Sequence, residues 1–347
     1  MKPTKMFRQV GLLLAAAIFS SATGAAAATV TLTYANFPPA ATFPCVQMER
    51  WAKEVEKKTA GQVKVRTFPG GTLLNAKNML EGVTSGVADI GNFAMSYQPG
   101  RFPVSEAIDL PYGFTSAKTA SLVLYDLIDK YKPKEFEKVK IITVFTCPPT
   151  NFMTSKPVRT LADLKGMELR VAGTGTEIAK RLGAVPIAMP QSETPEAIQK
   201  GIVKGMVSSL EILLDLKFAS YTPYATIANL PVVSFAVVMN KGKWDALPAN
   251  VKQAIDSLSR EQAAWTGSYA DTHVQEALAA AKKNYNHQVF TLPPADQKKV
   301  AQLLQPMVDD YVRKVSAQGV NGKQIVADVL ALKKKYEAPA GKPGKKK

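Results

Sequence analysis

The sequence is poor in the residues from which metal sites and catalytic triads are usually built. Its 347 residues contain 2 histidines and 2 cysteines, and none of these stands near another at metal-ligand spacing. Nucleophile-elbow, zincin and phosphate-loop signatures are missing as well. The sequence thus gives no support to an enzyme, and we predict neither catalytic activity nor a cofactor or bound metal. We expect His273 and His287 to be structural or surface residues.

Two further absences concern nucleic acids and dinucleotides. The formal net charge is +16, but the basic residues are spread over helical faces and do not cluster with aromatic residues, so we predict no nucleic-acid partner. Gly173-Thr174-Gly175 follows a predicted strand and opens a helix, yet the third glycine of a dinucleotide fingerprint is missing. A turn with a helix cap is the better interpretation of this segment.

The amino terminus has the pattern of a secretory signal peptide. Three basic residues precede an apolar run over residues 10–19, and alanines occupy 25–28. The apolar run is shorter than the about 20 residues that a membrane-spanning helix needs, and no other stretch is long and apolar enough. We therefore predict a cleavable signal peptide over residues 1–28 and a mature protein in the periplasm. That compartment permits a disulfide between Cys45 and Cys147, but their separation neither supports nor excludes one.

Strand-like and helix-like patterns alternate along the mature chain. A predicted strand over 30–34 is followed by a helical pattern in which Met48, Trp51 and Val55 share one face. Such alternation predicts an α/β fold with a largely parallel sheet. The roughly 320 residues after the signal favour two domains. A helical stretch over 248–284, some 50 Å long, is long enough to lie across both.

One arginine is notable because its neighbours in a predicted strand are apolar. Arg170 lies between Leu169 and Val171. An arginine whose neighbours point into a core needs an anionic partner. Residue chemistry leaves two partners open: a carboxylate side chain of the protein, or a ligand carboxylate held by the planar guanidinium.

Several segments, in a fixed order along the chain, resemble the DctP-type solute receptors of tripartite ATP-independent periplasmic (TRAP) transporters. The resemblance runs over essentially the whole mature chain, and its most specific segment ends on Arg170. Each segment is weak alone, and their order and spacing together carry the resemblance. The segments are 73–91, 100–103, 110–114, 161–170, 182–186 and 193–205.

This resemblance implies a two-lobed, type II-like periplasmic-binding-protein fold of the α/β class, with a ligand cleft between the lobes and a long helix spanning both. We expect a first lobe of residues 29–148 and 237–276, a second lobe of 149–236 and 277–335, and a disordered basic tail over 336–347. The implied partners are a small-molecule carboxylate and the small and large TRAP membrane subunits. We expect the receptor itself to be a monomer.

The resemblance also implies which residues bind the ligand. In the family, the arginine at the position of Arg170 pairs with the substrate carboxylate. Polar residues near the hinge and after the motif at 193–205 are expected to add hydrogen bonds, and aromatic residues of the first lobe are expected to cover the apolar part. The predicted binding residues are Arg170, Asn151, Ser208, Ser209, Phe37, Asn36, Thr72 and Phe93.

The predicted cleft is less polar than that of the family's sugar-acid receptors. Those receptors carry a second arginine, which Asn151 replaces here, and Phe37, Phe93 and Met95 offer apolar cover. We therefore expect an aromatic monocarboxylate, since stacking on an aromatic side chain adds about 0.5–1.5 kcal/mol beyond area burial. The alternatives are an aliphatic dicarboxylate or a sulfonate as ligand, and an ABC importer or a sensor as partner.

Overall fold

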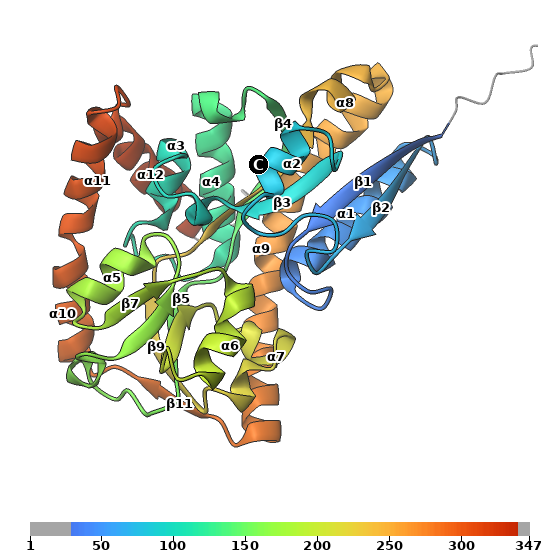
Figure 1. The fold of residues 1–347 in the computed structure, drawn as a ribbon. Helices are drawn as coiled ribbons and strands as arrows, with labels where there is room; N and C mark the ends of the chain where they lie inside the picture. The colour runs from blue at the N-terminus through green and yellow to red at the C-terminus, as the bar shows by residue number, and fades with distance from the viewer. Residues whose placement is uncertain (1–28, 339–347) are drawn as a thin grey trace, which may run out of the picture.

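A computed structural model describes residues 29–338, which form two α/β lobes, each built on one sheet (Figure 1). The predicted signal peptide lies outside the described residues, as do residues 339–347 of the predicted tail. Within residues 29–338, no helix is both long and apolar enough to cross a membrane. The two-lobed α/β architecture expected from the alternating pattern and from the family resemblance is confirmed.

The first lobe is built on a five-stranded sheet. β1, β2 and β3 run parallel, and β10 is antiparallel to both of its neighbours, β3 and β4. Helix α1 (Phe43–Lys58) buries the predicted face, with Met48, Trp51 and Val55 all inaccessible to solvent or nearly so. The strand order is β2 (Val63–Phe68), β1 (Val30–Asn36), β3 (Ile90–Ala94), β10 (Ser234–Asn240) and β4 (Val139–Thr146).

The second lobe is built on a six-stranded sheet. Arg170 lies on β6, beside Met206 of β8 and Ile187 of β7, and both of these neighbouring strands run parallel to β6. Strand β5 is antiparallel to β8 and β9. The order is β11 (Gln288–Thr291), β9 (Tyr224–Leu230), β5 (Thr150–Thr154), β8 (Gly205–Ser208), β6 (Glu168–Val171) and β7 (Val185–Ala188).

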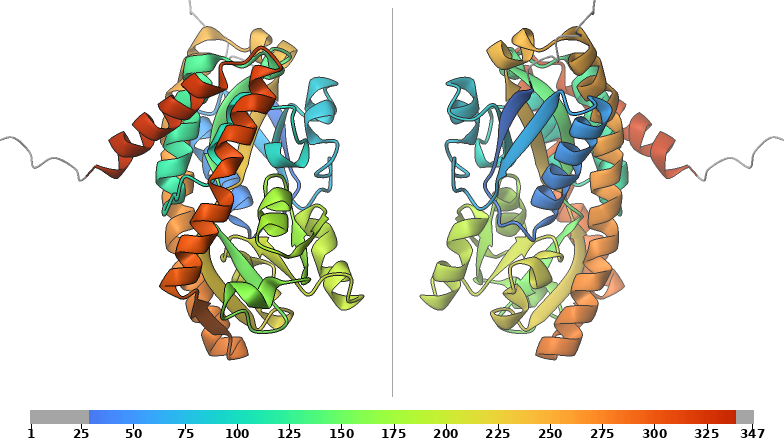
Figure 2. Two further views of the ribbon diagram at one scale, coloured as in Figure 1. Left: turned by 90° about the vertical axis from the view of Figure 1, so that its left-hand side faces the viewer. Right: turned by 90° about the vertical axis from the view of Figure 1, so that its right-hand side faces the viewer.

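One long helix joins the lobes. Helix α9 (Ala249–Tyr285, 37 residues) was expected over 248–284, and it runs along both lobes (Figures 1 and 2). It contacts α1 and α4 (Ala117–Tyr131) in the first lobe and α7 (Ile212–Asp215) in the second. A Cβ on Gly267 would lie 2.5 Å from the Lys118 Cα. The missing side chain at this position therefore lets the backbones of α9 and α4 approach closely.

The end of the chain returns to the first lobe. After α10 (Pro294–Leu304) and α11 (Pro306–Ser316), helix α12 (Gly322–Glu337) packs against α4. Asp328 of α12 accepts hydrogen bonds from Lys130 Nζ at 2.6 Å and from Tyr131 Oη at 2.5 Å. This placement differs from the expected boundaries, which assigned 277–335 to the second lobe and began a disordered tail at residue 336. The terminal helix buries its apolar side on α4, so it continues to Glu337.

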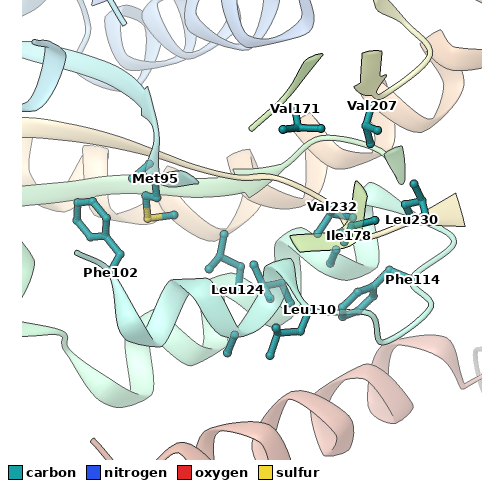
Figure 3. Packing of buried hydrophobic residues seen from close by; sticks show 14 of the residues in the cluster. Met95, Phe102, Leu110, Phe114, Leu124, Val171, Ile178, Val207, Leu230 and Val232 are labelled. Atoms are coloured by element: carbon teal, nitrogen blue, oxygen red, sulfur yellow. The ribbon is translucent and has the colours of Figure 1, made fainter. Parts of the chain in front are cut away.

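A single hydrophobic cluster extends through both lobes. It includes Phe102 and Leu124 of the first lobe and Val171 and Ile178 of the second, and Figure 3 shows these side chains with others of the cluster. The lobes are therefore in contact through buried side chains, not only through their connections. The shorter helices are α2 (Met79–Thr84), α3 (Pro103–Glu106), α5 (Gly175–Arg181), α6 (Thr194–Gln199) and α8 (Lys241–Ala246), and 3-10 turns at Met95–Tyr97 and Gln191–Glu193 carry Tyr97 and Gln191.

Candidate ligand-binding site

A cavity lies between the two lobes, and its lining is mostly apolar. The first lobe contributes Phe37, Phe43 and Phe235, and the second contributes Ile178 and Val207. Polar side chains are the minority of the lining, and in small-molecule sites such placed polar groups fix the orientation of the ligand. These polar residues are Tyr97, Arg170, Gln191, Ser208, Ser209, Glu211 and Asp215, with Thr42, Thr150 and Thr174.

Arg170 brings a buried positive charge to this cavity. Only 3% of the residue is exposed. Its Nε donates to Met189 O at 3.0 Å and its Nη1 donates to Gln191 Oε1 at 2.8 Å, so both of these acceptors are neutral. No ion pair involves Arg170 among residues 29–338, and burial lowers the pKa of its guanidinium. A buried charge without a counter-ion is costly, and an anion entering the cavity would compensate it.

Tyr97 reaches this arginine from the other lobe. Its hydroxyl oxygen accepts from Arg170 Nη2 at 3.5 Å and from the Gln191 backbone N–H at 3.2 Å. The Tyr97 ring lies against Phe37, with ring centroids 5.7 Å apart. Because the hydroxyl oxygen accepts both bonds, its own proton is free to donate to a bound anion.

Other contacts between the lobes surround the same point. The Thr174 hydroxyl donates to Asp109 O at 3.0 Å, and Lys77 pairs with Glu193 at 2.8 Å. A Cβ on Gly173 would lie 2.6 Å from the Ser96 Cβ, and Gly173 has a φ of +53°. The lobes are thus closed on one another, and a side chain at position 173 would collide with the first lobe.

The segment after β8 brings acidic groups to the cavity. Glu211 is 2% exposed, and its Oε1 accepts from the Ser209 hydroxyl at 2.5 Å. Burial raises the pKa of Glu211 to about 7. Asp215 Oδ1 lies 2.6 Å from His273 Nε2 of α9, and this hydrogen bond is the main reason that the pKa of His273 rises to about 9. Both histidines, expected to be structural or surface residues, are buried. Because its pKa is raised, His273 is charged at neutral pH and forms an ion pair with Asp215.

Four of the predicted binding residues line the cavity. They come from both lobes, since Phe37 follows β1 whereas Arg170, Ser208 and Ser209 belong to the second sheet or its loops. The Ser208 hydroxyl is also 3.5 Å from Gln191 Oε1, which links it to the partner of Arg170. The remaining four predicted residues, Asn151, Asn36, Thr72 and Phe93, lie outside the cavity lining.

Asn151 lies outside the cavity lining, and its side chain forms hydrogen bonds with backbone groups. Its Oδ1 accepts from the backbone N–H groups of Ala228 and Asn229 at 2.8 and 3.0 Å, and its Nδ2 donates to Pro149 O at 3.0 Å. The register of β5 against β9 shifts between Thr150 and Phe152, next to this residue. The side chain therefore satisfies backbone donors at an irregularity in the sheet, and its expected hydrogen bond to a ligand stays a prediction.

The other three residues are also occupied elsewhere. Asn36 is fully buried and donates to Pro44 O at 2.7 Å, and its Oδ1 accepts from Asn92 Nδ2 at 3.0 Å. The Thr72 hydroxyl donates to Pro69 O at 3.0 Å within a turn. Phe93 is 1% exposed and packs on Phe102 in the hydrophobic cluster, with ring centroids 5.6 Å apart. The apolar cover expected from Phe93 is therefore core packing.

Sequence reasoning missed several polar residues of the cavity. Tyr97 and Gln191 meet Arg170 from different segments, and no local spacing indicates such a meeting. Glu211 could have been found from the sequence, because it stands between Leu210 and Ile212 just as Arg170 stands between two apolar residues.

The cysteines are both buried and free, and Cys147 lines the cavity. Among the described residues no group of side chains is arranged to hold a metal ion.

Comparisons with known proteins agree on one family. The family model described as bacterial extracellular solute-binding protein, family 7, matches residues 35–314. The C4-dicarboxylate-binding protein DctB of Bacillus subtilis is 24% identical over 293 residues, which cover 82% of this chain and 81% of that protein.

Two solved structures have a similar fold over most of the chain. A TRAP periplasmic solute-binding protein from Desulfovibrio salexigens, described as an open complex, is 51% identical, covers 90% of this chain and 98% of its own, and has a TM-score of 0.81. A marine metagenome TRAP solute-binding protein specific for aromatic acid ligands, in complex with 3-hydroxybenzoate, is 26% identical, covers 89% and 99%, and has a TM-score of 0.85. Of these two, the less identical, ligand-bound structure is thus the more similar in shape.

Proposed function

The chain belongs to family 7 of the bacterial extracellular solute-binding proteins, and from this membership we propose that it captures a small organic acid in the cavity between its lobes and delivers it to the membrane subunits of a TRAP transporter. The single observation that carries the proposal is the Arg170 guanidinium, which is buried at the cavity with neutral partners only. A ligand carboxylate would supply the counter-ion through charge-assisted hydrogen bonds, which are about twice as strong as neutral ones.

Within this class we propose an aromatic monocarboxylate as the ligand. Arg170 is the one basic residue in the described lining of the cavity, which suits one carboxylate better than two. The rings of Phe37, Phe43 and Phe235 offer apolar surface, and ring contacts add to burial. The similar metagenome protein is specific for aromatic acid ligands, which supports the same assignment here.

The compartment, the oligomeric state and the membrane partners of the receptor belong to the same proposal. We infer a periplasmic, monomeric receptor without catalytic activity, exported by its signal peptide and served by a small and a large TRAP membrane subunit. Family membership supports the extracytoplasmic setting, and the names of the similar structures support the TRAP system. Genes for one small and one large membrane subunit beside this gene would favour TRAP over an ABC importer or a sensor.

The test of the carboxylate site is calorimetry on the mature protein with Arg170→Ala and a matched control. Arg159→Ala is the control, because Arg159 is an exposed arginine of the same lobe. With benzoate and 3-hydroxybenzoate as probes, we expect Arg170→Ala to weaken binding by about a hundredfold or more, since it removes the buried cation that pairs with the carboxylate. Near wild-type affinity in Arg170→Ala would refute the role of Arg170, and succinate binding tenfold tighter than both aromatic acids would refute the ligand class.

A further inference from the structure

Glu211 is a buried carboxylic group that the binding of a monocarboxylate does not use. It follows β8, lines the cavity, and is 2% exposed. The Ser209 hydroxyl donates to Oε1, whereas Oε2 is buried and has no hydrogen-bond partner in the structure. Buried polar atoms are nearly always paired, so an unpaired carboxylate oxygen at a ligand cavity points to a donor supplied by the ligand.

The charged groups around Glu211 do not supply that donor. His273 uses both ring nitrogens, with Asp215 on one side at 2.6 Å and Glu276 on the other at 2.7 Å. The Cys147 thiol also lines the cavity, but its sulfur accepts from the Val233 backbone N–H at 3.2 Å and no hydrogen bond joins it to Glu211 among the described residues. Arg170 forms no ion pair with Glu211 in the described part of the chain, and it is not among the groups that shift the pKa of Glu211. The cavity thus presents a cation and an acceptor oxygen at two separate positions.

We infer that the solute carries, besides its carboxylate, a hydroxyl or N–H group that donates a hydrogen bond to Glu211 Oε2. This inference rests on the proposed function, because it assumes that the carboxylate binds at Arg170. It narrows the ligand class from a plain aromatic acid to an acid with a second, donating group. A site built around a buried acceptor discriminates strongly against an analogue that lacks the donor, since the acceptor is then left unpaired.

The test compares carboxylates that differ by one donor group. Calorimetric titrations of the mature protein would use benzoate against 3-hydroxybenzoate and 4-hydroxybenzoate, and cyclopentanecarboxylate against pyroglutamate. We expect the wild type to bind at least one donor-bearing acid tenfold or more tightly than its parent. In Glu211→Gln this ratio should fall below about threefold, because Ser209 continues to donate to the amide oxygen and the amide nitrogen, a donor, then faces the ligand.

Glu196→Gln is the matched control, because Glu196 is a fully exposed glutamate of the same lobe, and it should keep the wild-type ratio. A second variant, Glu211→Met, removes the acceptor without adding a donor and should also lose the preference. Melting curves of each variant establish that it is folded.

The inference is overturned if the wild type shows no preference in any pair, or if Glu211→Gln and Glu211→Met keep it. These outcomes differ from failure of the proposed function. If the proposed function itself fails, the wild type binds none of the carboxylates, or Arg170→Ala binds them as well as the wild type does.

Discussion

The hydroxyl oxygen of Tyr97 lies 3.5 Å from Nη2 of Arg170, and this contact connects the first lobe to the second. The same oxygen accepts the backbone N–H of Gln191, whose side chain in turn accepts from Arg170 Nη1. Tyr97 is therefore bonded to the guanidinium and to the segment that orients it. Closing the lobes and positioning the guanidinium are coupled through one side chain.

Tyr97→Phe should weaken ligand binding by about tenfold. The substitution removes the acceptor for two donors of the second lobe, and a hydrogen bond of this kind contributes about 0.5–1.5 kcal/mol. The phenyl ring keeps its contact with Phe37, so we expect the melting temperature without ligand to change little. Calorimetry with 3-hydroxybenzoate measures the effect, and Tyr285→Phe, at an exposed tyrosine, is the control. Equal affinities of the two variants would contradict the coupling.

Gly173→Ala should hold the lobes apart. A Cβ at this position would lie 2.6 Å from the Ser96 Cβ of the first lobe, and the left-handed backbone adds about 1–2 kcal/mol of strain. Gly166→Ala is the matched control, because Gly166 also has a positive φ, +74°, but a Cβ added there would have no heavy atom within 4 Å. We expect Gly173→Ala to bind 3-hydroxybenzoate at least tenfold more weakly than the wild type, and Gly166→Ala to bind it as the wild type does.

Small-angle X-ray scattering would test the same pair of variants for closure. At saturating ligand, Gly166→Ala should give the radius of gyration of the closed wild type, whereas Gly173→Ala should stay larger. If both variants close equally, the approach of Gly173 to Ser96 does not limit closure.

The preference for a donor-bearing acid over its parent acid should rise with pH between 6 and 8. Burial raises the pKa of Glu211 to about 7, and the ionised carboxylate, which prevails above that pH, is the stronger hydrogen-bond acceptor. His273, with a pKa of about 9, stays charged in this range, and the pKa of Cys147 is raised by burial. The affinity ratio of 3-hydroxybenzoate to benzoate, measured at pH 6, 7 and 8, should therefore increase in the wild type. It should stay constant in Glu211→Gln, and an equal increase there would assign the titration to another group.

Local pattern predicted the alternating strands and helices of part of the chain and one part of the site, but not β5, β9, β11, α4 or the three helices after β11. The spacing of Met48, Trp51 and Val55 predicted a buried helical face, and a charged residue between Leu169 and Val171 indicated that Arg170 is buried beside a ligand or a counter-ion. The buried helical face and the burial of Arg170 both depend on residues close in sequence, so a local pattern can indicate them.

The remainder of the site depends on contacts between distant segments. Asn151 was expected to contact the ligand because it stands where the family's sugar-acid receptors carry a second arginine, and the structure places its side-chain oxygen on two backbone donors beside the shifted register of β5 on β9. Tyr97 and Gln191 meet only because the lobes are closed. Neither a sheet irregularity nor a contact between lobes leaves a periodic signal in the sequence.

The position of β10 has a consequence for how the chain folds as it is made. This strand, residues 234–240, lies between β3 and β4 in the first sheet. Until more than two thirds of the chain has been synthesised, β3 is therefore paired with β1 alone and β4 has no partner strand. Pairings this distant in sequence carry a large loop-closure cost and form slowly. The first half of the chain therefore cannot complete this sheet by itself, and the first lobe closes only after five of the six strands of the second sheet have been synthesised.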